Sequence, residues 1–274
     1  MTSLKTKFEK LLVTSVLAIG GFIVSIPFIW MVLSSFKSER EARTMPPTFW
    51  PEEFTFEHYI NLFANLNFGT YFINTLIIVA FALLGLLFNT MAGYGFAKFQ
   101  FKGREVVFLA VLATMMIPAQ VAMIPVYLIL NQMGLTNTMA GIILPGLIAA
   151  FNIFLIRQFM TTIPNDLIES ARIDGAREFR IFFQIIIPLS KPVLAVQAIL
   201  TFVGAWNSFL WPLIVANEQS LYTLSVGLAL LRGQHASSFA LQMAGATVMV
   251  IPVLILFVFV QRYIVEGFNT TGIK

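Results

Sequence analysis

The chain contains no cysteine and only two histidines, His58 and His235, among its 274 residues. The lack of cysteine excludes disulfide bonds and cysteine-ligated metal centres. Both histidines fall in segments that we predict to lie between membrane spans, so a catalytic metal site is not expected either. The sequence therefore predicts no metal, no cofactor and no catalytic residue.

Charged residues are also scarce, at 11% of the chain against 58% hydrophobic residues, and the mean hydropathy is +0.85. These values are typical of a protein with several membrane spans. A helix needs roughly 20 apolar residues to cross a bilayer. Six segments of about this length predict an all-α membrane protein with six transmembrane helices in a single domain, residues 1–274. They are Leu11–Leu33, Tyr71–Ala97, Val106–Leu130, Thr138–Ile156 (interrupted by Gly141, Pro145 and Gly146), Val193–Ala216 and Phe239–Val260.

Acidic and basic residues are missing from the centres of the predicted spans. Ion- and proton-coupled carriers usually need a charged group or a histidine there to bind the driving ion. The chain also lacks the G-x-x-x-x-G-K-[ST] phosphate-binding loop of many ATPases, and it has no Ser/His/Asp constellation. We therefore expect a transport protein that is not an enzyme and that a partner drives.

The distribution of lysine and arginine predicts the orientation in the membrane. If the N-terminus is cytoplasmic, most of the 17 basic residues fall in cytoplasmic segments, as the positive-inside rule requires. Both termini are then cytoplasmic. Because the basic residues are distributed by side of the membrane and do not cluster on one soluble face, the net charge of +4 does not indicate binding to nucleic acid.

Two longer segments are predicted on the outer side. Phe36–Thr70 is rich in proline and aromatic residues. It is expected either to lie along the membrane surface, where aromatic rings are favoured, or to form a packed cap. Asn217–Ser238 is a polar connection before the last span.

A charged segment, Arg157–Lys191, separates the fourth and fifth spans on the predicted cytoplasmic side. Asn165 or Asp166 is suited to cap a short helix, and Gly175 permits a turn that a residue with a β-carbon would resist. An apolar stripe with i, i+3, i+4 and i+7 spacing then predicts a second helix, ended by prolines. The stripe consists of Phe179, Phe182, Phe183 and Ile186, and the prolines are Pro188 and Pro192.

Two short helices around a glycine turn form a compact knob that suits a groove in another protein. Ala171, Gly175 and Ala176 are small enough to permit close approach of that partner. The alternative is an amphipathic helix on lipid headgroups. Four acidic residues disfavour contact with an anionic membrane surface, namely Asp166, Glu169, Asp174 and Glu178.

The charged segment resembles the signature loop of ABC-importer permeases, whose pattern is E-A-A, three residues, G, nine residues and I-x-L-P. The chain has Glu169-Ser170-Ala171, Gly175 and Ile185-Ile186-Ile187-Pro188 at this spacing. Ser170 replaces the middle alanine and Ile187 replaces the leucine. Further similar runs indicate the carbohydrate, maltose-type branch and the smaller permease of its pair, among them Phe72-Ile73-Asn74-Thr75, Ala92-Gly93-Tyr94-Gly95-Phe96-Ala97 and Trp206–Pro212.

The resemblance implies a type I ABC-importer permease fold with a cytoplasmic coupling helix, in the cytoplasmic membrane of a bacterium or archaeon. The implied partners are a second permease chain, two ATPase subunits, an external solute-binding protein, a sugar and membrane lipid. By position, Asn217–Ser238 would contact the binding protein, and the tail Glu266–Lys274 would reach along the ATPases. The ATPase-coupling residues would be Glu169 as charged anchor with Ser170, Ala171, Asp174, Gly175, Ala176 and Pro188.

Several amide side chains fall within or near the spans, namely Asn74, Asn89, Gln120, Asn152, Asn207 and Gln242. A buried amide in a membrane most often bonds a neighbouring helix. The alternative is that some of them line a polar path and bond sugar hydroxyls. The candidates for this path are Asn207, which lies beside a proline-broken helix, together with Trp206, Trp211, Tyr94 and Gln120.

The leading hypothesis is a sugar-carrying permease subunit of an ABC importer. One alternative is a carrier or channel that works without ATP, which the missing intramembrane charge and the signature loop disfavour. Another is an ABC permease for a different solute, such as an amino acid or a metal oxyanion. The resemblance along the whole chain favours a carbohydrate.

Overall fold

The computed structural model describes residues 2–269, with side chains for residues 9–261. Within residues 2–269 the chain is helical and has no β-strand, which confirms the all-α prediction. In that range five helices are long and apolar enough to cross a membrane, or six if one bent pair counts as a single span. The side chains of the predicted tail, Glu266–Lys274, lie outside the described residues.

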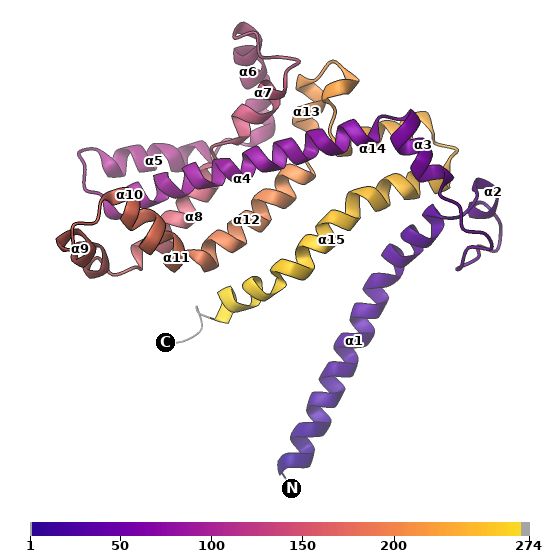
Figure 1. Ribbon diagram of the computed structural model, residues 1–274, viewed down its shortest axis with the longest axis horizontal. Coiled ribbons are helices and arrows are strands. Elements are labelled where there is room, and N and C mark those ends of the chain that lie inside the picture. Colours follow the sequence, from indigo (N-terminus) through magenta and orange to yellow (C-terminus); the bar gives the residue numbers. More distant parts are fainter. Residues whose placement is uncertain (1, 270–274) are drawn as a thin grey trace. The chain divides into compact units, whose positions relative to one another are not determined.

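The helices follow one another with mostly short connections, the longest being residues 43–56 between α2 and α3 (Figure 1). In chain order they are α1 (Thr2–Ser35), α2 (Glu39–Ala42), α3 (Glu57–Asn65), α4 (Phe68–Lys98), α5 (Arg104–Thr114), α6 (Ala119–Gln132), α7 (Met139–Ile143), the 3₁₀ turn η1 (Leu144–Gly146), α8 (Ala150–Thr161), α9 (Asp166–Ile173), α10 (Glu178–Ile181), the π-helical turn η2 (Phe182–Ile186), α11 (Ile187–Leu189), α12 (Lys191–Trp206), α13 (Leu210–Val215), the 3₁₀ turn η3 (Gln219–Leu221), α14 (Leu224–Gln234) and α15 (Phe239–Asn269).

The chain forms two compact units. The first comprises the residues up to Asn67 together with Leu228–Pro252, and the second comprises Phe68–Gly227 and the residues from Val253 onward. In the first unit, the apolar side chains of α1 are largely exposed, which suits a helix surrounded by lipid or by another subunit.

The segment after α1, also in the first unit, folds into a packed cap. Lys37 is buried, and its ammonium group donates to the carbonyl oxygen of Thr48 and lies 4.7 Å from the centre of the Trp30 ring. A ring nitrogen of His58 lies 2.9 Å from the Lys37 carbonyl oxygen. Packing within the segment agrees with the expected cap, whereas Phe49, Trp50, Phe54 and Phe56 remain exposed. Contact of these rings with a membrane surface stays a prediction.

In the second unit, α4 packs against α8 and α12 (Figure 1). A glycine permits the close approach of α4 to the chain just before α8. A β-carbon on Gly85 would lie 2.4 Å from the carbonyl oxygen of Leu147, well inside van der Waals contact. The absence of a side chain at this position therefore sets how closely α4 packs in the second unit.

The fourth predicted span is broken at residues 147–149, between η1 and α8. Asn89 of α4 spans the break. Its amide nitrogen donates to the Leu147 carbonyl oxygen at 3.2 Å, and its amide oxygen accepts from the Ala149 N–H at 3.1 Å. Unpaired backbone groups are costly inside a bilayer, so this one side chain allows the span to be irregular here.

The third predicted span is bent. The structure corrects the expectation of one continuous helix over Val106–Leu130, because α5 and α6 meet at an angle of 102°. Pro118 immediately precedes α6, at its N-cap position. Proline has no N–H to donate, and it disfavours the helical conformation of the residue before it, so the chain leaves the axis of α5 before it reaches α6.

Most of the amide side chains singled out from the sequence bond neighbouring segments, as expected. Asn74 donates to the carbonyl oxygens of Ser220 at 2.7 Å and Tyr222 at 3.0 Å. In the first unit, Gln242 donates to the carbonyl oxygen of His235 at 2.9 Å. With the contacts of Asn89 and the hydrogen bond of Asn152 to Thr201, four of the six amides bond a neighbouring segment.

Replacing Gly85 with alanine tests the close packing of α4. The added β-carbon would meet backbone rather than a movable side chain, so we expect a loss of about 1–3 kcal/mol of stability. Thermal unfolding of the purified chain in detergent measures the effect. Gly95→Ala, on the same helix with nothing within 4 Å of its β-carbon, is the matched control. Equal unfolding temperatures for the two variants would contradict the packing argument.

Candidate functional site

The charged segment gathers at the Lys98 end of α4 (Figure 1). Its first helix, α9, ends in a Schellman turn with Gly175 at a φ of 80°. The Ala176 N–H donates to the Ala171 carbonyl oxygen at 2.9 Å, and the Gly175 N–H donates to that of Arg172 at 3.0 Å. This pattern of hydrogen bonds requires a left-handed residue after the helix. The predicted glycine turn is therefore confirmed, and it accounts for the spacing between Ala171 and Gly175.

The inner face of α9 packs within the chain. Ile168 is buried, and Ala171 and Ala176 pack against a cluster that includes Ile163 and Ile181. The two alanines are half-buried, so part of their surface packs α9 onto its own chain. Their contact with a partner stays a prediction.

The outer face of α9 carries an exposed apolar residue beside acidic ones. Ile173 is 87% exposed, and Glu169, Ser170 and Asp174 are also exposed. Glu169 and Ile173 are four residues apart and share one face of the helix. Sequence reasoning missed Ile173. The signal available was its place at the tip of the predicted helix, one turn after Glu169.

Hydrogen bonds attach α9 to α4 at both ends. Near its start, the Lys98 ammonium group donates to the Asn165 side-chain oxygen at 2.9 Å. Near its end, Arg172 donates to one carboxylate oxygen of Glu178 at 2.7 Å, and this hydrogen bond raises the pKa of Arg172. The other carboxylate oxygen of Glu178 accepts from the Tyr94 hydroxyl at 3.3 Å.

The predicted second helix contains the wider π-helical turn η2, and the residues of its apolar stripe do not all lie on one face. Phe182 and Ile186 are buried, whereas Phe179 and Phe183 are exposed. A π-helical turn pairs residues five apart, so the i, i+3, i+4, i+7 positions no longer share one face. The predicted break before the next span lies at Ser190, between Pro188 in α11 and Pro192 in the first turn of α12, where a missing N–H is tolerated.

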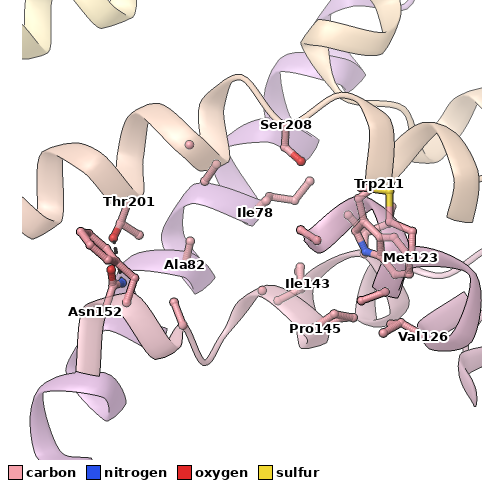
Figure 2. A pocket seen from close by; sticks show the side chains of 18 of the residues that line it. Ile78, Ala82, Met123, Val126, Ile143, Pro145, Asn152, Thr201, Ser208 and Trp211 are labelled. Carbon is pink, nitrogen blue, oxygen red and sulfur yellow. Dashed lines mark hydrogen bonds between the residues drawn. The ribbon is translucent and has the colours of Figure 1, made fainter. Parts of the chain in front are cut away.

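A cavity of about 640 Å³ lies in the second unit between α4, α6, α8, α12 and the turn after α12. Figure 2 shows Asn152 and Thr201 at one end and Trp211 with Met123 at the other. The Asn152 amide donates to the Thr201 hydroxyl at 3.4 Å. The residues that line this cavity, all in the described part of the chain, include no charged side chain. Most of them are small or apolar, such as Ile78, Ala82, Ala122, Gly146, Gly204 and Ala205.

Trp211 is the predicted path residue that lines this cavity, and its indole N–H donates to the Gly141 carbonyl oxygen at 3.3 Å. Sequence reasoning missed two hydroxyl residues of the lining, Thr201 and Ser208. Thr201 lies on α12 and Ser208 in the turn after it, so helical spacing alone does not bring the two together.

The other four predicted path residues lie outside the lining. Trp206 is fully buried and stacks on Phe202, with ring centres 5.6 Å apart. Asn207 is exposed at the end of α12 and donates to the carbonyl oxygen of Val203, in its own helix. Gln120 is exposed on α6, and Tyr94 lies beside the charged segment.

The predicted polar connection Asn217–Ser238 is largely helical, because it contains η3 and α14. Leu224 is fully buried, and its N–H donates to the Thr75 hydroxyl of α4 at 2.9 Å. The start of α14 is therefore unavailable to a partner, and the exposed stretch just before it is Asn217–Ser220.

A family model described as the binding-protein-dependent transport system inner membrane component matches residues 89–269. Among curated relatives, the arabinooligosaccharides transport system permease protein of Halalkalibacterium halodurans is 37% identical over 96% of both chains. The diacetylchitobiose uptake system permease protein of Streptomyces coelicolor is 36% identical over 91% of this chain and 84% of its own length. The lactose transport system permease protein of Rhizobium radiobacter is 33% identical over 97% of both.

Two solved structures are similar in fold. A chain in the crystal structure of a bacterial ABC transporter involved in the import of the acidic polysaccharide alginate superposes with a TM-score of 0.80 at 26% identity, covering 94% of this chain and 96% of that one. A chain in a bacterial alginate ABC transporter in complex with a pentasaccharide-bound periplasmic protein gives a TM-score of 0.63 at 18% identity, covering 93% of both.

Substituting Gly175 tests the Schellman turn. Alanine at a φ of 80° costs about 1 kcal/mol or more, whereas asparagine tolerates this conformation better. We expect hydrogen exchange of the α9 amides to accelerate about fivefold in Gly175→Ala and by less in Gly175→Asn. Gly204→Ala, at a helical glycine with nothing within 4 Å of its β-carbon, is the control. Identical exchange in all three variants would contradict the strain argument.

Proposed function

This chain belongs to the family of binding-protein-dependent transport system inner membrane components, and we propose that it carries a neutral sugar or oligosaccharide across the membrane as one permease of a two-permease ABC importer. It is a transport subunit of an ABC importer and not an enzyme. ATP hydrolysis belongs to two separate ATPase subunits. An external solute-binding protein delivers the sugar to the permease pair.

The observation that carries this proposal is the exposed face of α9, set off by the Gly175 turn. Glu169 and Ile173 provide an acidic and an apolar contact on one helical face. A short amphipathic helix of this kind fits a groove in a partner protein. We assign α9 as the coupling helix that docks on the ATPase, with Glu169, Ser170, Ile173 and Asp174 in the contact.

The substrate class follows from the relatives and from the cavity. The named relatives carry arabinooligosaccharides, diacetylchitobiose and lactose. The polar groups of the cavity are an amide, two hydroxyls and an indole, which suit neutral sugar hydroxyls and ring faces. A charged solute would lie among apolar walls with no counter-charge in this half of the path. A neutral sugar is therefore favoured over an amino acid or an oxyanion.

The orientation completes the proposal. The charged segment faces the cytoplasm, where ATP is available, and both termini lie on the same side, as the positive-inside distribution predicts. The exposed stretch Asn217–Ser220 is then external and offers a contact for the binding protein. Movement of the two docked coupling helices opens and closes the path by rigid-body displacement of the spans.

Charge reversal at Glu169 tests the docking assignment. In proteoliposomes that contain the whole importer, we expect Glu169→Lys to lower ATP-dependent sugar uptake and co-purification of the ATPase by at least about tenfold. The lysine would face a basic group that the glutamate had paired with, or would be a buried cation without a partner in the contact. Gln158→Lys adds a positive charge at an exposed position of the same segment and is the control. Normal uptake and co-purification in Glu169→Lys would contradict the assignment, and wild-type uptake without ATP would contradict the importer itself.

Filling the cavity tests the path. Gly204 lines the cavity, and a β-carbon there meets nothing within 4 Å, so Gly204→Leu adds bulk without a clash at its β-carbon. We expect a strong loss of sugar uptake with normal binding of the ATPase. Gly20→Leu, on α1 with the same open surroundings, is the control. Full uptake by Gly204→Leu would show that sugar does not pass through this cavity.

A further inference from the structure

We propose that Glu178 is the positioning residue that transmits movement of α9 to α4, through its hydrogen bonds to Arg172 and Tyr94. This inference rests on the proposed function, because it takes α9 as the helix on which the ATPase acts. It assigns Tyr94 a role in transmission in place of the one predicted on the sugar path.

The first observation is that the two carboxylate oxygens of Glu178 bond two different helices. One oxygen accepts from Arg172 of α9 at 2.7 Å, and the other accepts from the Tyr94 hydroxyl of α4 at 3.3 Å. Arg172 is charged, so its hydrogen bond to the carboxylate is of the stronger, charge-assisted kind. A displacement of the end of α9 therefore reaches α4 through this carboxylate, in addition to the apolar packing of α9.

The second observation is that α4 receives α9 at two points on one face. Tyr94 and Lys98 are four residues apart, so they lie on the same side of α4. Lys98 donates to the side chain of Asn165 at the start of α9. Tyr94 donates to Glu178, which in turn bonds Arg172 near the end of α9. Two polar attachments, one at each end of α9, supplement its apolar packing and fix its direction relative to α4.

The third observation is that α4 connects this attachment with the cavity. It is one helix from Phe68 to Lys98, and Ile78 and Ala82 of the same helix line the cavity. Ile78 lies about 24 Å along the axis from Tyr94 at the usual helical rise. A rigid helix of this length carries a displacement of its cytoplasmic end to the wall of the path.

The surroundings of Glu178 leave room for movement. Beside it lies a smaller cavity of about 280 Å³, lined by Met91, Tyr94, Gly95, Phe99, Glu178, Phe179 and Phe182. Glu178 and Phe179 therefore border open space, rather than being enclosed by the apolar cluster beneath α9. This arrangement is expected of a joint that changes position during the transport cycle.

The test measures ATP hydrolysed per sugar imported, in proteoliposomes with the complete importer. Tyr94→Phe removes one hydroxyl and keeps the ring, and Glu178→Gln keeps the size and loses the charge. We expect either variant to retain the ATPase and to raise this ratio at least about threefold. The double variant should raise it no further than the larger single effect, because both substitutions break the same link.

Arg180→Gln is the matched control, since Arg180 is exposed on α10 and bonds Gln184 rather than α4. An unchanged ratio in Tyr94→Phe, or loss of the ATPase from that variant, would overturn the proposal. Tyr94→Phe decides the outcome if Glu178→Gln does not fold. If instead the wild-type importer shows no ATP-dependent uptake, the proposed function fails before the role of Glu178 is at issue.

Discussion

Every backbone polar group inside a bilayer must find its partner within the protein, and the second unit depends on how this requirement is met where helices break. At the break before α8, Asn89 bonds both sides of the gap. At the break after α12, the Ser208 carbonyl oxygen accepts from the Thr223 hydroxyl at 3.0 Å. Both breaks adjoin the cavity. Residues around them, including Gly146 and Ser208, line it, so the irregular backbone helps to form the cavity.

The helix α4 is central to both candidate sites. Its glycine at position 85 permits close approach to the backbone before α8, and its asparagine at position 89 satisfies that backbone. Toward the charged segment the same helix presents Tyr94 and Lys98. The close packing before α8, the hydrogen bonds of Asn89 and the attachment of α9 thus all involve one continuous helix. This continuity offers a physical route between an event at α9 and a change in the cavity.

The signature pattern of the charged segment combines two kinds of residue. Ala171, Gly175 and Ala176 build the Schellman turn and pack it onto the chain. Glu169 and Ile173 remain exposed on the other face. The pattern thus encodes the shape of the knob through small residues and a left-handed glycine. The exposed positions are specified less completely, since Ile173 is not part of the pattern.

The sequence by itself determined the all-α class, the membrane location and the position of the glycine turn, because mean hydropathy, charge distribution and glycine conformation are local properties. It did not determine the bend before Pro118, the π-helical turn that divides the aromatic stripe, or which amides face the cavity. Those features depend on contacts between residues far apart in the chain. Tyr94 shows the difference, since a tyrosine near the end of a span suits a sugar path equally well. Only the fold brings Glu178, 84 residues later, within hydrogen-bond reach of its hydroxyl.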